Sequence, residues 1–210
     1  MGLSKGFRVA AYAAAVVAMS ASTRTAWADT ISGSIWENDP TGAADATVAN
    51  VPLSTPDVTF SVNSPFTFAS GGLYTIGEFL TSGGASVLTG ASELGNGLDN
   101  TLFDFKGTVS VTNGQTFTVT HDDGLTLTID GLLVIDQPGP TPPITQTFTY
   151  TGATGNLPFE LVYGECCGPP ATLQISLPLA NSTVPEPSSI MLLGAGLLGL
   201  GASFKRKLSS

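Results

Sequence analysis

The sequence predicts an all-β protein built as an antiparallel β-sandwich, with an open β-barrel as the alternative. Apolar and polar residues alternate with period two through the middle of the chain, and turn sequences separate these short segments. Threonines fill the polar positions, and no amphipathic helix is expected outside the two ends. Each end is expected to form an apolar helix, a signal helix first and a transmembrane helix last.

The expected strands follow the alternation in chain order. They lie at residues 58–62, 66–68, 103–105, 109–111, 117–120, 125–129, 132–135, 148–150, 159–163 and 173–177. Asn113-Gly114 and Asp130-Gly131 each predict a hairpin turn, because these pairs tolerate the positive φ that tight hairpins need. Segment 132–135 is apolar throughout, which predicts a central strand. The proline-rich run 137–143 predicts a long loop.

The N-terminal segment is typical of an export signal. Lys5 and Arg8 precede an apolar run at 9–19, and a small-x-small sequence ends at Ala28. The run is too short for a stable membrane anchor, so cleavage is predicted between Ala28 and Asp29.

The C-terminal segment predicts a short membrane helix with a basic stop. The tripeptide Pro185-Glu186-Pro187 precedes an apolar stretch at 188–204, and Lys205-Arg206-Lys207 follows it. The stretch lies at the lower limit of about 17 residues for a membrane span, and the basic cluster is expected to stay cytoplasmic. The prolines break secondary structure just outside the bilayer and leave an accessible backbone there.

This order of features resembles the PEP-CTERM sorting signal of Gram-negative bacteria over residues 184–207. The resemblance implies recognition by an exosortase, a membrane transpeptidase-like enzyme, and association with extracellular polysaccharide. The protein would first be held in the inner membrane and then reach the cell envelope, surface or matrix. A plain membrane anchor is the alternative.

The chain is therefore expected to have five parts. They are a signal peptide at 1–28, an exported domain at 29–180, a linker with the Pro-Glu-Pro motif at 181–187, a transmembrane helix at 188–204 and a basic tail at 205–210.

The exported domain is strongly acidic. Between residues 29 and 184 there are fifteen carboxylates and one basic residue, Lys106, which gives a net charge of −14. Nucleic acid and anionic lipid surfaces are excluded as partners by this charge. Divalent cations and neutral, hydroxyl-rich ligands suit it, although excess acid also serves simple solubility.

Asp122 and Asp123 are the candidate site residues of this domain. Adjacent carboxylates repel unless a cation or hydrogen-bond donors compensate them, so the pair is either a solvated turn or part of a cation site. His121 shares the parity of Phe117 and Val119, which predicts a buried histidine bonded to backbone. Asp130 is expected to be a turn residue only.

The same stretch resembles the protective-antigen (PA-fourteen) β-sandwich family, well over 100–177 and weakly over 29–99. The matching motifs are Phe117-x-Val119-x-His121-Asp122-Asp123-Gly124, Leu127-x-Ile129-Asp130-Gly131, Phe148-x-Tyr150-x-Gly152, Leu161-Val162-Tyr163-Gly164-Glu165 and Ala171-x-Leu173. In the adhesins of that family, two consecutive Asp residues joined by a cis peptide bind Ca²⁺, which holds sugar hydroxyls. The resemblance implies that Asp122 and Asp123 are the ligands here.

Cys166 and Cys167 are the only cysteines and lie in a domain expected in an oxidising compartment. Adjacent α-carbons are about 3.8 Å apart, below the usual disulfide range of about 4.4–6.8 Å, so a bridge between them would be strained. If it forms, residues 165–170 become a rigid loop. That loop is either a local staple or one wall of a binding site beside Asp122 and Asp123.

Three classes of function follow. The first is a non-enzymatic envelope or matrix protein that binds glycans, with or without Ca²⁺, and the second is a structural surface protein without a small ligand. The third is a hydrolase, which the sequence disfavours because it has no paired-acid motif, nucleophile elbow or histidine cluster. No catalytic residue and no cofactor other than Ca²⁺ is expected.

Overall fold

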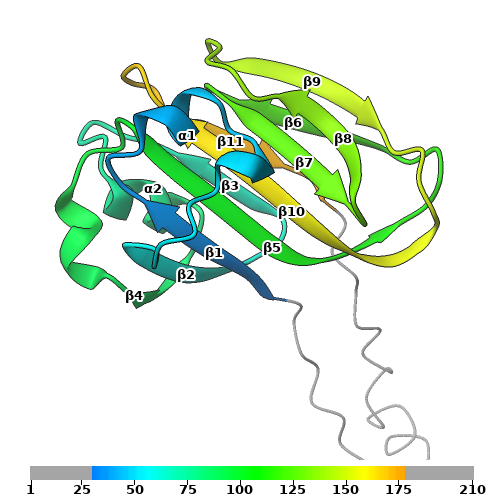
Figure 1. Cartoon of the computed structure of the whole chain (residues 1–210), viewed down its shortest axis with the longest axis horizontal. Helices are drawn as coiled ribbons and strands as arrows, with labels where there is room; N and C mark the ends of the chain where they lie inside the picture. Colours follow the sequence, from blue (N-terminus) through cyan, green and yellow to red (C-terminus); the bar gives the residue numbers. More distant parts are fainter. Residues whose placement is uncertain (1–29, 178–210) are drawn as a thin grey trace, which may run out of the picture. The chain divides into compact units, whose positions relative to one another are not determined.

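Two antiparallel β-sheets pack face to face in residues 30–177, the part of the chain that this computed structural model describes (Figure 1). The predicted β-sandwich is confirmed, and the barrel alternative is wrong because the two sheets stay separate. The predicted signal peptide, sorting motif, transmembrane helix and basic tail lie outside the described residues. Within residues 30–177, no helix is long and apolar enough to span a membrane.

The larger sheet has seven strands and the smaller sheet has four. In spatial order, the larger sheet consists of β4 (Ser86–Thr89), β2 (Val58–Asn63), β1 (Thr30–Trp36), β5 (Thr101–Val111), β10 (Gly155–Glu165), β7 (Leu125–Ile129) and β8 (Leu132–Gln137). The smaller sheet consists of β3 (Phe66–Ala69), β11 (Thr172–Ile175), β6 (Thr116–His121) and β9 (Ile144–Thr149). The strands are joined by loops, two α-helices, α1 (Pro40–Ala44) and α2 (Ile76–Ser82), and two 3₁₀-helices, η1 (Val48–Asn50) and η2 (Ala91–Gly95).

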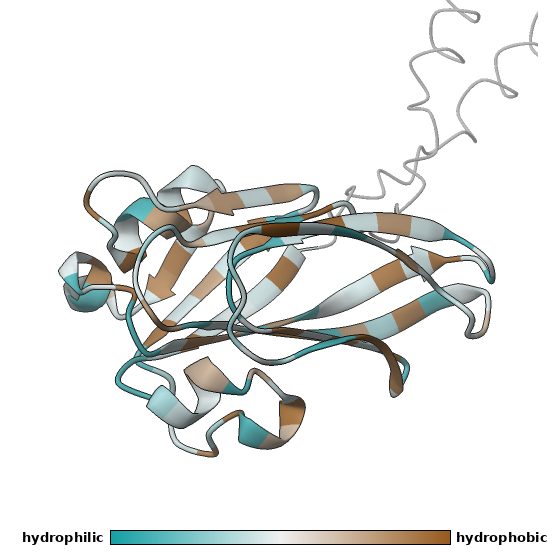
Figure 2. Ribbon diagram, turned by 90° about the horizontal axis from the view of Figure 1, so that it is seen from above, coloured by the Kyte–Doolittle hydropathy of each residue, from teal (hydrophilic) through white to brown (hydrophobic). Residues whose placement is uncertain are grey.

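Phenylalanines from both sheets fill the space between them. The rings of Phe66 and Phe105 stack with centroids 5.5 Å apart, and Phe60 meets Phe105 edge to face at 5.5 Å. Phe68 of the smaller sheet contacts both Phe60 and Phe105. The period-two pattern of the sequence places these residues inward, and Figure 2 shows the resulting bands of apolar and polar residues along the strands.

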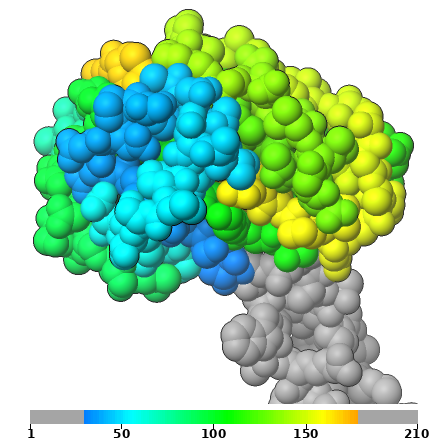
Figure 3. Space-filling model, in the orientation of Figure 1, coloured from blue at the N-terminus to red at the C-terminus, as the bar shows by residue number. Residues whose placement is uncertain are grey.

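The outer face of the larger sheet is covered near its centre by the segment 37–57, which contains α1 and η1 (Figure 3). Ala46 of this segment packs with Leu102 of β5 and Val162 of β10. A Cβ atom on Gly164 would overlap the backbone of Ala43, so the glycine allows α1 to approach the sheet closely.

The absence of an amphipathic helix was wrongly predicted. Helix α2 begins after Thr75, whose side chain accepts a 3.3 Å hydrogen bond from the backbone N–H of Glu78. It buries Ile76, Phe79 and Leu80, which occupy positions i, i+3 and i+4. The helix has only seven residues, and this length is too short for a periodic signal to stand out in the sequence.

The prediction that segment 132–135 forms a central strand is also wrong. Strand β8 lies at the edge of the larger sheet, and Leu132 and Leu133 are 39% and 50% exposed. An apolar run shows which side chains favour burial, but it does not show whether another strand covers them.

Of the two predicted hairpins, the structure has one. Asp130 and Gly131 both have positive φ and join β7 to β8 with Ile129 opposite Leu132, as predicted. Asn113-Gly114 instead connects β5 to β6, which belong to different sheets. The Asn113 side-chain amide donates to the carbonyls of residues 151 and 152, so the turn is fixed by its neighbour loop rather than by strand pairing.

Candidate functional site

Three loops meet at one end of the sandwich and enclose a groove of about 420 Å³. One loop joins β6 to β7, the second joins β8 to β9, and the third joins β10 to β11. The lining residues are Asp122, Asp123, Pro140, Thr141, Pro142, Pro143, Cys167, Gly168, Pro169 and Pro170. The groove therefore brings the predicted Asp pair, the predicted proline loop and the cysteine loop together.

The Asp pair sits where the chain crosses from the smaller to the larger sheet. β6 ends at His121 and β7 begins at Leu125, so Asp122, Asp123 and Gly124 span the gap between the sheets. The Asp122 N–H donates to the carbonyl of Thr172 at 2.9 Å, and the Asp123 N–H donates to the carbonyl of Thr141 at 2.8 Å. These bonds tie the crossing to the start of β11 and to the loop between β8 and β9.

Asp122 and Asp123 are each only 5% exposed. The pair is therefore not solvated, and Asp123 has the positive φ, 59°, of a turn residue, so a structural turn and a cation site both remain as alternatives. His121 is fully buried, and its Nδ1 lies 2.8 Å from the carbonyl oxygen of Asp123, as expected for a histidine bonded to backbone. Asp130 is the turn residue that the sequence predicts.

The peptide bond between Asp122 and Asp123 is trans. Within residues 30–177 the cis bonds are Ser64-Pro65 and Pro169-Pro170, so the cis Asp-Asp bond implied by the adhesin resemblance is wrong for this structure. A non-proline cis bond would cost about 3–4 kcal/mol and would need metal binding or packing to compensate it. The trans bond needs no such compensation.

Burial dominates the electrostatics of the pair. It raises the pKa of Asp122 to about 6, with the Asp123 carboxylate adding to the rise and the Asp123 backbone N–H opposing it. Burial also raises the pKa of Asp123, although the backbone groups of Cys166 and Thr141 oppose the rise.

No lysine or arginine in residues 30–177 compensates these carboxylates. Lys106 is the one Lys or Arg in that range, and its Nζ lies 2.8 Å from Asp104 Oδ2 and 3.1 Å from Glu160 Oε1. The charge of the Asp pair is therefore balanced only in part, by backbone N–H groups and, to a smaller extent, by His121.

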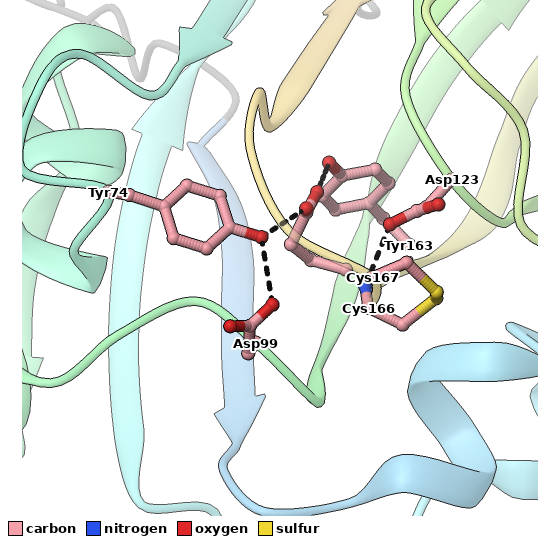
Figure 4. Close-up of a disulfide and its surroundings, with 7 residues drawn as sticks. Tyr74, Asp99, Asp123, Tyr163, Cys166 and Cys167 are labelled. Atoms are coloured by element: carbon pink, nitrogen blue, oxygen red, sulfur yellow. Dashed lines mark hydrogen bonds between the residues drawn. A yellow bond between two sulfur atoms is a disulfide. The ribbon is translucent and has the colours of Figure 1, made fainter.

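Cys166 and Cys167 form a disulfide in the structure, with their α-carbons 3.8 Å apart. The Cys166 N–H donates a 2.8 Å hydrogen bond to Oδ2 of Asp123 (Figure 4). Cys167 has a φ of 63°, and the Gly168 N–H folds back to the Cys166 carbonyl at 2.6 Å. Cys166 is buried, whereas Cys167 is exposed at the groove.

A further buried acid, next to Cys166 in the chain, was missed by sequence reasoning. Glu165 is fully buried and accepts hydrogen bonds from the hydroxyls of Tyr74, at 2.6 Å, and Tyr163. Burial raises the pKa of Glu165 to about 8, while the two hydroxyls oppose the rise and the Asp pair adds to it. Figure 4 shows Tyr74 and Asp99 on one side of this cluster and Asp123 with the disulfide on the other.

The signal for Glu165 was present in the sequence. It shares the parity of Leu161 and Tyr163 in β10, and residues of that parity face the core. A carboxylate at an inward position needs hydrogen-bond donors or a raised pKa, and Glu165 has both.

The donor chemistry of the groove fits a hard cation such as Ca²⁺. Carboxylate oxygens of Asp122 and Asp123 are the ligands that Ca²⁺ prefers, and the buried hydroxyl of Thr141 has no hydrogen-bond partner in the described part of the chain. Asp123, Cys166 and Cys167 also cluster within 4.8 Å, but disulfide sulfurs are not thiolates and do not favour Zn²⁺. Ca²⁺ takes about six to eight oxygens, so water and ligand hydroxyls would complete its shell.

Comparison with known proteins identifies the C-terminal signal. Residues 183–207 match the model of the PEP-CTERM protein-sorting motif, which confirms the predicted sorting signal and indicates export. No curated protein matches the chain.

Two solved structures share the fold. One is described as the PA14 sugar-binding domain from an RTX adhesin, with 20% identity, a TM-score of 0.50, and coverage of 71% of this chain and 88% of that chain. The other is the PA14 domain of the MpAFP antifreeze protein, with 20% identity, a TM-score of 0.53, and coverage of 76% and 86%. In fold, residues 30–177 are thus similar to PA14 β-sandwiches, as the sequence resemblance implies.

Proposed function

We propose that this protein is a non-enzymatic component of the cell envelope or extracellular matrix that binds carbohydrate through Ca²⁺ held by Asp122 and Asp123. An exosortase would process it at the PEP-CTERM signal after it is held transiently in the inner membrane. The sorting-motif match and the similarity to a PA14 domain described as sugar-binding support this proposal.

One observation carries the proposal. Two buried, adjacent carboxylates line an open groove, and the part of the chain at residues 30–177 offers them no lysine or arginine partner. Keeping both ionised in a buried site is costly unless a cation compensates them. Bound Ca²⁺ would supply that charge and, with coordination positions left open, would hold vicinal hydroxyl groups of a sugar.

The residues around the pair have definite roles in this proposal. The Cys166 N–H fixes Oδ2 of Asp123 and so holds the orientation of the carboxylate that would bind the cation. The Thr141 carbonyl fixes the backbone of Asp123, and the Thr141 hydroxyl supplies a further oxygen at the groove. The neighbouring prolines restrict the backbone around the groove.

Calorimetric titration of the oxidised full chain with Ca²⁺ tests the site. The chain is kept in a detergent without a sugar headgroup, and neutral glycans are then screened in Ca²⁺ and in EDTA. Ca²⁺ binding is expected for the native chain and lost in Asp122→Asn with Asp123→Asn. Asp136→Asn, an exposed change on β8, is the matched control and should bind normally.

Absence of Ca²⁺ binding, or equal binding by the double variant, would remove the calcium site. Ca²⁺ binding without any glycan would instead favour the purely structural role. Mass spectrometry of envelope material tests the sorting step separately. Processed protein should lack residues 190–207, and retention of that segment would indicate a simple anchor.

A further inference from the structure

The groove is lined by two chemically different sets of residues. Asp122, Asp123 and Thr141 supply oxygens. The remaining lining is apolar or nearly so: Cys167, Gly168 and the prolines at 140, 142, 143, 169 and 170. No aromatic side chain lines this groove, so any flat apolar surface for a ligand must come from the disulfide and the prolines.

The disulfide is suited to be that surface because it is both exposed and rigid. Its bond joins neighbouring residues and closes a small ring with the connecting backbone, so neither side chain can rotate away. Cys166 is buried and bonded to Asp123 through its N–H, while Cys167 is exposed at the groove. Sulfur is polarisable and a weak hydrogen-bond acceptor, and it therefore presents an apolar contact.

A neutral hexopyranose has the matching two-sided chemistry. One face of its ring carries C–H groups, and its edge carries adjacent hydroxyls. An anionic sugar fits less well, because the exported domain has a net charge of −14. A mostly apolar, rigid lining with a few fixed polar groups is what orients a small ligand in a pocket.

We propose that the Cys166–Cys167 disulfide, with Pro169 and Pro170 beside it, forms a platform for the C–H face of a neutral hexopyranose whose adjacent hydroxyls face Asp122 and Asp123. This inference rests on the proposed function, since it assigns a ligand class to the same groove. It adds a binding role for the disulfide beyond that of a local staple.

The deciding variant is Cys166→Ala with Cys167→Gly. It removes both sulfurs, while glycine adopts the positive φ of residue 167 without strain. The loop can therefore keep its conformation, and the backbone N–H of residue 166 can still donate to Asp123. Gly139→Ala is the matched control, because an added Cβ there meets nothing within 4 Å and residue 139 does not line the groove.

Binding is measured by calorimetry on the full chain at saturating Ca²⁺. The probes are the methyl glycosides of mannose, galactose and glucose, with glucuronate as the anionic comparison. At least one neutral glycoside should bind to the native chain and to Gly139→Ala, and glucuronate should bind more weakly. The double cysteine variant should bind the same glycoside about tenfold more weakly, the loss expected from removing an apolar contact of this size.

The Ca²⁺ titration of each variant separates the two proposals. If the native chain binds Ca²⁺ and a glycoside, and the cysteine variant binds the glycoside equally well, the platform is overturned while the proposed function stands. If the native chain binds neither, the proposed function itself fails.

Saturation-transfer NMR on the native chain provides a measurement that does not depend on any variant. Ring protons on one face of the bound glycoside should receive the strongest saturation. Saturation confined to protons beside the coordinated hydroxyls would overturn the platform. This result would decide the question even if the double cysteine variant also lost its Ca²⁺ binding.

Discussion

The backbone N–H of Cys166 donates a 2.8 Å hydrogen bond to Oδ2 of Asp123, across 43 positions of sequence. One residue follows the end of β10 in the larger sheet, and the other follows the end of β6 in the smaller sheet. The bond continues the pairing of β10 with β7 inside the larger sheet, where Tyr163 lies opposite Leu125 and the Gly164 N–H donates to the Gly124 carbonyl at 2.9 Å. Four predictions follow from this relationship and from the groups around it.

Asp123→Ala should destabilise the protein more than Asp123→Asn. Alanine leaves the buried Cys166 N–H without an acceptor, which costs about 1–3 kcal/mol, whereas the asparagine carbonyl can accept the same bond and tolerates positive φ. Denaturant unfolding in EDTA measures the difference without any contribution from a cation. Equal losses of stability in the two variants would show that the bond to Cys166 contributes little.

Gly124→Ala should disturb the groove while Gly139→Ala should not. A Cβ on Gly124 would overlap the carbonyl of Pro138, which also accepts a 2.9 Å hydrogen bond from the Ala46 N–H. Forcing that loop away should cost about 1–3 kcal/mol, against less than about 0.5 kcal/mol for the open position 139. Thermal and denaturant unfolding of both variants make the comparison, and an unaffected Gly124→Ala would contradict the close packing of the proline loop.

Glu165→Gln should change how stability depends on pH. Burial raises the pKa of Glu165 in the folded protein to about 8 from the ordinary 4.5, so folding favours the protonated acid. Its contribution is fully present below about pH 4.5 and is lost as the pH rises through about 8. Each pKa unit corresponds to about 1.4 kcal/mol, so the decline should amount to a few kcal/mol.

The Gln variant should lack the part of this decline that extends to pH 8. It should retain the decline near pH 6, to which Asp122 contributes. The free energy of unfolding is measured between pH 4 and 9, with Asp136→Asn as an exposed control. Parallel curves for Glu165→Gln and the native chain would mean that Glu165 is not held protonated by the fold.

Lys106→Met should lower stability by about 1–3 kcal/mol at pH 7. Its removal leaves Asp104, which is buried, without its cationic partner, and the half-exposed position of Lys106 keeps the loss below that of a fully buried pair. Burial already raises the pKa of Asp104, so the loss should shrink as the pH falls and the acid becomes neutral.

Adding Asp104→Asn to Lys106→Met should recover most of the lost stability. Denaturant unfolding of the two single variants and the double variant at pH 7 and pH 4 gives the coupling. If the double variant is as unstable as Lys106→Met alone, the ion pair is not the source of the effect.

The strands were largely predictable because their signal is local. Alternation in β2, β6 and β10 fixes which side chains face inward whatever the partner strand is, and Asp130-Gly131 specifies its own hairpin. Strand position was not predictable on the same basis. The apolar residues of β8 predicted a central strand, yet the strand lies at the edge of the sheet. Which strands become neighbours depends on long-range packing, which a local pattern does not report.

The sequence by itself determined the acidic, alternating β domain, the sorting signal at 183–207 and the identity of the unusual residues, Asp122, Asp123, Cys166 and Cys167. Those properties depend on composition and on neighbours a few positions apart. The tertiary structure alone decided that the Asp pair is buried, that its peptide bond is trans, and that the disulfide and proline loops enclose it. The physical reason is that burial and loop contact depend on how two sheets pack, which brings together residues separated by many positions in the chain.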